Sequence, residues 1–275
     1  MDDRGFPPQT VLRAFGATEP PVRMAGGQGQ NYRSGQIVLK PAKDDEETTW
    51  TAEFYLAVND PAFRLPKPLR SDRGGFVCDG WQAWEYIEGE HRHEEGCWQE
   101  IIGVCVRFHQ AIADMPRPAW FARREQNPWV VADKVAWGEA ELAFSPPIAP
   151  AVERLRRRLR RYPRPVGARS QIIHGDFGGN VLFADGVPPA VIDLSPYWRP
   201  AAFAVGVIIA DAIVWEGAEM ALIAAGNGFA DFTQHLLRAE LRRIIELETL
   251  HQIYGWEHRD DITAHLPLIE VLENL

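Results

Sequence analysis

The chain has 275 residues, of which 46% are hydrophobic and 24% are charged, a composition that is ordinary for a globular protein with a sizeable core. Its formal net charge of −9 argues against nucleic acid as the main ligand, because proteins that bind phosphate backbones usually present a basic surface. No apolar run reaches the length of a membrane span and the polar N-terminus does not resemble a signal peptide, so we expect a cytoplasmic protein that does not bind membranes.

The first predicted elements, from about residue 20, are two strands joined by a glycine-rich turn. The second strand ends at Lys40, and the turn comprises Gly26, Gly27, Gln28 and Gly29. Glycines let backbone N–H groups approach anionic oxygens, so such a turn can cradle phosphates, although the same pattern also occurs in ordinary hairpins. Lys40 also has two interpretations: a solvated lysine at a strand end, or a contact to nucleotide phosphates.

A helix is predicted next, and it begins with four acidic residues, Asp44–Glu47, which favour the positive end of a helix dipole. Its apolar residues, Trp50 and Phe54 among them, fall on one face at helical spacing. Glu53 lies at the edge of that face, so it is our candidate for a carboxylate partner of Lys40. The two glutamates in the first turn are more simply explained as partners of the dipole.

Two more strands, at 76–78 and 81–87, are predicted on either side of Asp79–Gly80, a strong hairpin signal. Gly89 then marks a boundary, so we expect an N-terminal nucleotide-binding lobe at 1–88 and a C-terminal catalytic lobe at 89–275. Beyond the boundary, apolar stripes at helical spacing predict helices at 98–113, 151–162 and 231–251.

Two acidic elements in the second lobe carry the clearest chemical signal. The stretches QIIHGDFGGNVLF, at Gln171–Phe183, and VIDLSP, at Val191–Pro196, are apolar runs that each deliver an acidic residue to the end of a predicted strand. Asp176 and Asn180 follow the first run, and Asp193 ends the second. A lone Asp after a strand is usually a turn or cap residue. The pair favours metal-assisted phosphoryl transfer, in which one carboxylate accepts a proton while an amide and another carboxylate hold Mg²⁺ against phosphates.

The HGDFGGN and VIDLSP elements resemble the catalytic and metal-binding elements of the aminoglycoside phosphotransferase and choline kinase superfamily. The resemblance implies a two-lobed, protein-kinase-like α+β fold, in which an N-terminal antiparallel sheet with one helix is followed by a mostly helical lobe. It implies ATP and Mg²⁺ as cofactors, Asp176 as the catalytic base, and Asn180 and Asp193 as metal ligands. His174 is expected to support the loop rather than to react.

By the same resemblance, the segment 84–87 corresponds to the hinge that links kinase lobes. The Glu85 carbonyl and the Ile87 amide would contact adenine, with Trp84 behind the ring. Gly26–Gly29 and Lys40 would contact the phosphates. An ordinary apolar edge strand is the alternative for the segment.

The loop after the first acidic element departs from the family pattern. The family places four residues between the Asp and the Asn, whereas only Phe177, Gly178 and Gly179 lie between Asp176 and Asn180. Losing one residue shortens the reach of an extended loop by about 3.5 Å. The two glycines can adopt positive φ, however, and would close the gap by a tighter path.

We therefore expect an ATP-dependent phosphotransferase that acts on a hydroxyl of a small molecule. The negative net charge favours an amine-bearing acceptor, and the family also accommodates sugar-like ones. The shortened loop motivates an alternative, a nucleotide-binding module without catalysis. A third hypothesis is a metal-dependent hydrolase that uses His174, Asp176, Asp193 and another histidine.

Overall fold

The computed structural model describes residues 5–24, 29–42, 44–92, 97–124 and 126–275. The chain divides into two units, which comprise residues 1–91 with 181–193, and residues 92–180 with 194–275. The first unit therefore contains a segment from the far side of the sequence-predicted boundary at residue 88.

That segment is a hairpin of β8 (Val181–Leu182) and β9 (Ala190–Val191). Backbone pairing holds the hairpin in the first unit, because the Arg64 N–H donates to the Pro189 carbonyl at 2.8 Å. Such bonds join residues that are far apart in sequence, so local periodicity does not reveal them.

Apart from the β8–β9 hairpin, which is a separate two-stranded sheet, the described strands of the first unit form one antiparallel sheet of order β1-β2-β3-β6-β4, with β5 paired to β6. They are β1 (Val22–Arg23), β2 (Tyr32–Ser34), β3 (Ile37–Pro41), β4 (Pro68–Leu69), β5 (Val77–Cys78) and β6 (Trp81–Glu85). The predicted hairpin is confirmed: Asp79 and Gly80 join β5 and β6 with φ of 50° and 76°, the positive values that a two-residue type I′ turn requires.

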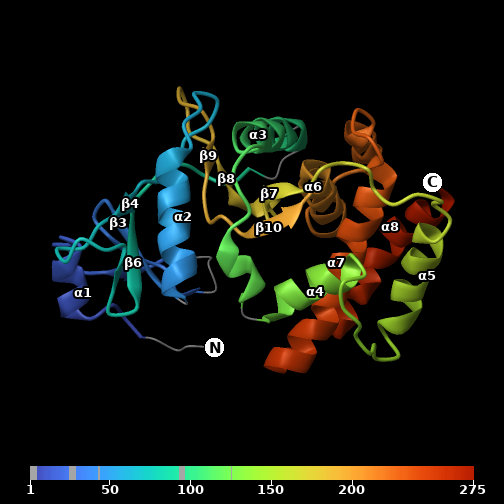
Figure 1. Ribbon diagram of the computed structural model, residues 1–275, viewed down its shortest axis with the longest axis horizontal. Coiled ribbons are helices and arrows are strands. Elements are labelled where there is room, and N and C mark those ends of the chain that lie inside the picture. The colour runs from blue at the N-terminus through green and yellow to red at the C-terminus, as the bar shows by residue number, and fades with distance from the viewer. Residues whose placement is uncertain (1–4, 25–28, 43, 93–96, 125) are drawn as a thin grey trace. The chain divides into compact units, whose positions relative to one another are not determined.

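Helix α2 (Asp45–Ala57) confirms the predicted acidic helix. It begins after Asp44, whose side chain accepts a hydrogen bond from the Glu47 N–H at 2.8 Å, the interaction expected of an N-cap aspartate. The helix packs on β4 and β5, and it lies beside β4 in Figure 1. Its buried residues include Phe54 and Tyr55.

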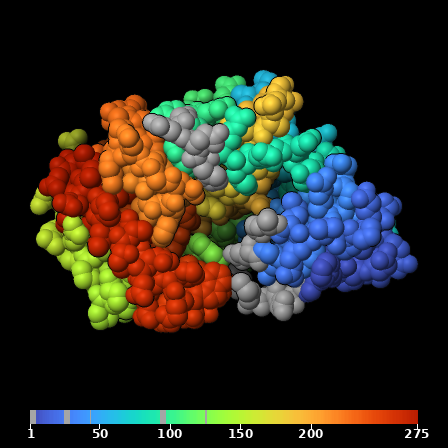
Figure 2. Space-filling view, turned by 180° about the vertical axis from the view of Figure 1, so that it is seen from behind, coloured from blue at the N-terminus to red at the C-terminus, as the bar shows by residue number. Residues whose placement is uncertain are grey.

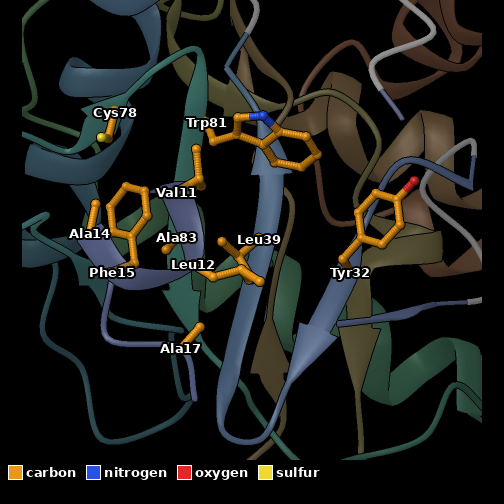
Figure 3. Close-up of a cluster of buried hydrophobic side chains, with 10 residues drawn as sticks. All are labelled: Val11, Leu12, Ala14, Phe15, Ala17, Tyr32, Leu39, Cys78, Trp81 and Ala83. Atoms are coloured by element: carbon orange, nitrogen blue, oxygen red, sulfur yellow. The ribbon is translucent and has the colours of Figure 1, made fainter. Parts of the chain in front are cut away.

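A second, shorter helix of this unit, α1 (Gln9–Ala14), is not indicated by the sequence pattern. Its Val11 and Leu12 belong to a buried cluster with Tyr32, Leu39 and Trp81 of the sheet (Figure 3). Six residues span less than two helical turns, too few for periodicity to stand out. Tertiary packing therefore determines this helix.

The second unit is mostly helical, as predicted. Its helices are α3 (Cys97–Ala111), α4 (Pro128–Ala136), α5 (Ala149–Leu159), α6 (Ala201–Trp215), α7 (Phe232–Tyr254) and α8 (Ile262–Asn274), with short 3-10 turns at Ala119–Ala122, Met220–Gly226 and Arg259–Asp261. Helix α7 packs against α4, α5, α6 and α8 (Figure 1). Helices α5 and α8 also pack together, yellow-green and red in Figure 2. No helix within the described ranges is long and apolar enough to span a bilayer.

Helices α6 and α7 approach each other closely at Gly206, where an added Cβ would lie 3.3 Å from the backbone of His235. Between this unit's helices, β7 (Gln171–His174) pairs antiparallel with β10 (Pro196–Arg199). Helix α6 packs on β7, so the loop that follows β7 begins at a buried strand.

We expect His235 on α7 to make the stability of the second unit depend on pH. Its side chain is fully buried, and among the described residues neither ring nitrogen has a hydrogen-bond partner. Burial, aided by the charge of Arg238, lowers the pKa of His235 from 6.5 to about 4. Between these values the unfolded chain binds the extra proton, so stability is lost as the pH falls from 6.5 towards 4.

Replacing this imidazole should remove that dependence. Between about pH 7.5 and about pH 5, the native chain should lose about 2 kcal/mol more free energy of unfolding than His235→Leu does. Urea unfolding at the two pH values measures the difference. Parallel losses in the two proteins would contradict the assignment, whatever the substitution does to stability at neutral pH.

Candidate active site

Lys40 and Asp193 form an ion pair within the first unit. Lys40 lies on β3, where it is opposite Gln82 of β6, and its Nζ donates to Oδ1 of Asp193, which follows β9. Asp193 has a φ of 50°, a left-handed conformation that is uncommon outside glycine and often occurs at functional sites. The ion pair therefore joins Lys40, which is a candidate for binding nucleotide phosphates, to Asp193, which is a candidate metal ligand.

Glu53, the predicted partner of Lys40, is exposed on α2. In the described ranges the ion pair of Lys40 is with Asp193, so a pair with Glu53 stays a prediction. Gly26, Gly27 and Gln28 of the predicted phosphate turn lie outside the described residues. Gly29 has a φ of 68°, a conformation in which glycine is strongly favoured.

The predicted hinge segment continues from β6. Trp84 is buried, its ring packs edge-on against Tyr55 of α2 with centroids 5.0 Å apart, and its Nε1 donates to Gln82 at 2.9 Å. Trp84 therefore lies between sheet and helix. The Glu85 N–H donates to the Lys67 carbonyl at 2.8 Å. Among the described hydrogen bonds none uses the N–H of Ile87, so this donor is compatible with the predicted contact to adenine.

In the second unit, a pair of buried histidines supports the loop that carries Asp176. The Asp176 N–H donates to Nδ1 of His174 at 3.2 Å, and the His174 N–H donates to Nε2 of His109 at 3.0 Å. His109 Nδ1 lies 2.7 Å from the Cys105 carbonyl, so this nitrogen carries the proton. Burial lowers the pKa of His109 to about 3, which keeps it neutral. The expected supporting role of His174 agrees with these contacts.

The carboxylate of Asp176 is held by an arginine from α7. Nη2 of Arg243 lies 2.9 Å from Oδ1 of Asp176, and half of the Asp176 side chain is exposed, at 50%. Burial raises the pKa of Asp176, but the Arg243 charge and hydrogen bond more than offset this, and the net pKa lies below its usual value. Asp176 is therefore ionised at neutral pH and can accept a proton.

The shortened loop closes through a single turn of 3-10 helix at Gly178–Asn180. The Asn180 N–H donates to the Phe177 carbonyl at 3.0 Å, and Nδ2 of Asn180 donates to the Asp176 carbonyl at 2.6 Å. The predicted path with positive φ at the glycines is wrong, because neither Gly178 nor Gly179 is among the positive-φ residues. A 3-10 turn instead advances less per residue than an extended loop does, and it brings Asn180 back to Asp176.

Sequence reasoning missed the charged groups behind the loop. Arg242 on α7 donates through Nη1 to the Gly175 carbonyl at 2.8 Å and through Nη2 to the Tyr197 hydroxyl at 3.2 Å. Arg243 also contacts Asp211 of α6 and Glu246 of α7. Two consecutive arginines in a predicted helix, with a glutamate one turn later, were the available signal.

Gly175 is required by this packing. An alanine Cβ there would lie 2.7 Å from Cε2 of Tyr197 and 3.1 Å from Nη1 of Arg242. We expect Gly175→Ala to lower the free energy of unfolding by about 1–3 kcal/mol, the usual cost of overpacking. Gly179→Ala is a matched control in the same loop, since an added Cβ there meets nothing within 4 Å. Urea unfolding that ranks the two variants equally would contradict this packing argument.

Within the described residues, no group of three or more His, Cys, Asp or Glu side chains is arranged to hold a metal ion by itself. A site for Mg²⁺ needs fewer protein ligands, because Mg²⁺ is usually bound by one or two carboxylates together with substrate phosphates and water. Asp193 in the first unit and Asn180 in the second each carry oxygen atoms of the kind that Mg²⁺ prefers.

A family model described as "Phosphotransferase enzyme family" matches residues 26–242. No curated protein sequence matches the chain. Among solved structures, the chain is similar to an amicoumacin kinase in complex with AMP-PNP, Ca²⁺ and Ami, at 14% identity and a TM-score of 0.65, over 97% of this chain and 92% of that one.

Two other solved structures give the same result. A microcompartment-associated aminopropanol kinase matches at 15% identity and a TM-score of 0.63, over 96% of this chain and 95% of that one. A thermostable mutant of an aminoglycoside phosphotransferase matches at 14% identity and a TM-score of 0.60, over 96% and 97%. At these identities the likeness shows the fold alone, which is the protein-kinase-like α+β fold that the sequence predicted.

Proposed function

The chain belongs to the phosphotransferase enzyme family, and from this premise we propose that it transfers the γ-phosphoryl group of ATP to a hydroxyl of a small molecule. The observation that carries the proposal is the Asp176 carboxylate. It is half exposed, its pKa is lowered, and only one of its oxygens is taken by Arg243. A carboxylate of this kind suits a base that orients and deprotonates an acceptor hydroxyl.

In the proposed reaction, Oδ2 of Asp176 accepts the hydroxyl proton as the acceptor oxygen bonds to the γ-phosphorus. The bond between the γ-phosphorus and the oxygen that bridges to the β-phosphate breaks, and ADP leaves with those electrons. His174 holds the Asp176 backbone during this step through its bond to the Asp176 N–H. Because Asp176 is ionised beforehand, no proton has to be removed from the base at neutral pH.

The remaining site residues are proposed for ATP and Mg²⁺. Lys40 would contact the phosphates beside Gly26–Gly29, and the carbonyl of Glu85 and the N–H of Ile87 would contact adenine. Trp84 would lie behind the adenine ring, and Glu53 would lie beside Lys40.

The oxygens of Asp193 and Asn180 fit Mg²⁺, a hard cation. Because Nδ2 of Asn180 is bonded to the Asp176 carbonyl, the amide oxygen Oδ1 is the atom left for a cation. When bound, Mg²⁺ would neutralise charge on the β- and γ-phosphates.

For the acceptor, we propose an amine-bearing or sugar-like alcohol. The formal charge of −9 favours a cation over an anion. Structurally similar proteins include an aminopropanol kinase and an aminoglycoside phosphotransferase by their printed names. These names suggest which compounds to test first.

A phosphorylation assay tests the proposal. The full chain is incubated with ATP, Mg²⁺ and a panel of amino alcohols, amino sugars and neutral sugars, and products are identified by mass spectrometry. A phosphate ester that forms with the native chain and not with Asp176→Asn supports the proposal. ATP binding without any product over the panel and a metabolite extract would favour the non-catalytic alternative.

A further inference from the structure

We propose that Arg243 is a positioning residue for the transfer reaction, one that fixes Oδ1 of Asp176 so that Oδ2 faces the acceptor hydroxyl. The proposal rests on the proposed function, because it assigns a partner to the base of that reaction. Arg243 lies on α7, 67 residues from Asp176 along the chain, and no motif links the two.

The guanidinium of Arg243 is itself held rigidly. Its Nε donates to Oδ1 of Asp211 at 2.7 Å and its Nη2 contacts Oδ2 of the same carboxylate, a two-pronged contact from α6. Its Nη1 donates to Glu246 at 2.9 Å. The Arg243 side chain is only 13% exposed. A planar guanidinium fixed by carboxylates on two helices cannot turn away, so it presents Nη2 to Asp176 at a defined place.

The two oxygens of Asp176 are left in different surroundings. Oδ1 receives the charge-assisted bond from Arg243 at 2.9 Å. Among the described hydrogen bonds, the one that reaches Oδ2 comes from Nδ2 of Asn180 at 3.4 Å, a long contact that contributes little. The terminal torsion of an aspartate is broad, and the Arg243 bond fixes the plane of the carboxylate. The oxygen that remains available is Oδ2.

The neighbouring arginine holds the backbone of the loop. Arg242 is almost fully buried, at 1% exposure, and it binds the Gly175 carbonyl and the Tyr197 hydroxyl. Arg242 therefore fastens the backbone of the loop to β10. Arg243 contacts no backbone atom of the loop among the described hydrogen bonds, and it contacts the side chain of the proposed base.

The test is a double-substitution cycle. Arg243→Gln should lower kcat by about 100-fold, the effect of misplacing a reacting group by about 1 Å, while KM for ATP changes by less than about threefold. Arg243→Lys keeps the positive charge but lacks the planar guanidinium with its fixed donors, so we expect an intermediate loss of kcat, about tenfold. Arg154→Gln, which breaks an arginine pair with Glu273 of α8 at 2.6 Å, should leave kcat unchanged.

Non-additivity separates positioning from stabilisation of the fold. If Arg243 acts through Asp176, then Arg243→Gln should cause less than about threefold further loss in an Asp176→Asn background, measured under single-turnover conditions. Additive losses in the double variant would overturn the inference, as would an Arg243→Gln protein with native kcat.

Folding and function are checked separately. Thermal unfolding verifies that each variant is folded, and Asp211→Asn, which weakens the hold on Arg243, replaces Arg243→Gln if that protein does not fold; it should show the same non-additivity. A native chain that makes no phosphate ester would defeat the proposed function. A native chain whose activity needs Asp176 but not Arg243 would defeat only this inference.

Discussion

Asp176→Asn is expected to lower kcat by about 10²- to 10⁴-fold, the usual contribution of a general base. An amide cannot accept the hydroxyl proton, yet Asn has nearly the same shape as Asp. The two contacts that the loop makes through the Asp176 backbone, with Nδ1 of His174 and Nδ2 of Asn180, do not require the carboxylate. We therefore expect the variant to fold and to bind ATP within about threefold of the native chain.

Two measurements complete this experiment. Steady-state kinetics with the identified acceptor give kcat, and isothermal titration with a non-hydrolysable ATP analogue gives the affinity. An Asp176→Asn protein with native turnover would exclude Asp176 as the base. A variant that loses ATP affinity together with turnover would instead indicate a damaged fold.

Features specified by neighbouring residues could be predicted from the sequence. The hairpin at Asp79–Gly80 and the acidic start of α2 were predicted because a turn and a helix cap depend on residues within a few positions of each other. The HGDFGGN and VIDLSP motifs identified the fold in the same way. Each motif lies on one short stretch of chain.

Features that depend on distant contacts could not be predicted. The arginine that holds Asp176 comes from α7, and a helical pattern alone does not say which charged residue will face a loop of another element. The β8–β9 hairpin likewise returns to the first unit because of the chain topology, and this return brings Asp193 to Lys40. Sequence spacing predicted that these residues carry chemistry but not which of them meet.

The loop between Asp176 and Asn180 was predicted in part. The missing residue was visible in the sequence, and the expectation of a tighter path was right, but the expected conformation was not. A 3-10 turn needs ordinary right-handed dihedrals, so the glycines are not used for positive φ. The bond from Nδ2 of Asn180 to the Asp176 carbonyl fixes the amide, which keeps the proposed ligand role of Asn180 chemically reasonable.

Asp193→Asn should be nearly as damaging as loss of the base, because it removes the carboxylate proposed to hold Mg²⁺ and leaves Lys40 without its partner. Charge stabilisation by a bound metal is worth several kcal/mol, so we expect kcat to fall by about 10³-fold. The Mg²⁺ concentration needed for half-maximal activity should rise as well. The rise in the Mg²⁺ requirement is specific to the loss of a metal ligand, because the loss of the ion pair with Lys40 alone would not change the Mg²⁺ concentration that is needed.

Glu53→Gln provides the matched comparison, because Glu53 is the other carboxylate considered as a partner of Lys40. Its side chain is exposed, and exposed ion pairs contribute about 0–1 kcal/mol, so we expect ATP affinity and turnover to change by less than about fivefold. Magnesium titrations of both variants, at fixed ATP, distinguish the two roles. If Glu53→Gln is the more damaging substitution and Asp193→Asn leaves the magnesium dependence unchanged, the metal role belongs elsewhere and the partner of Lys40 during catalysis is Glu53.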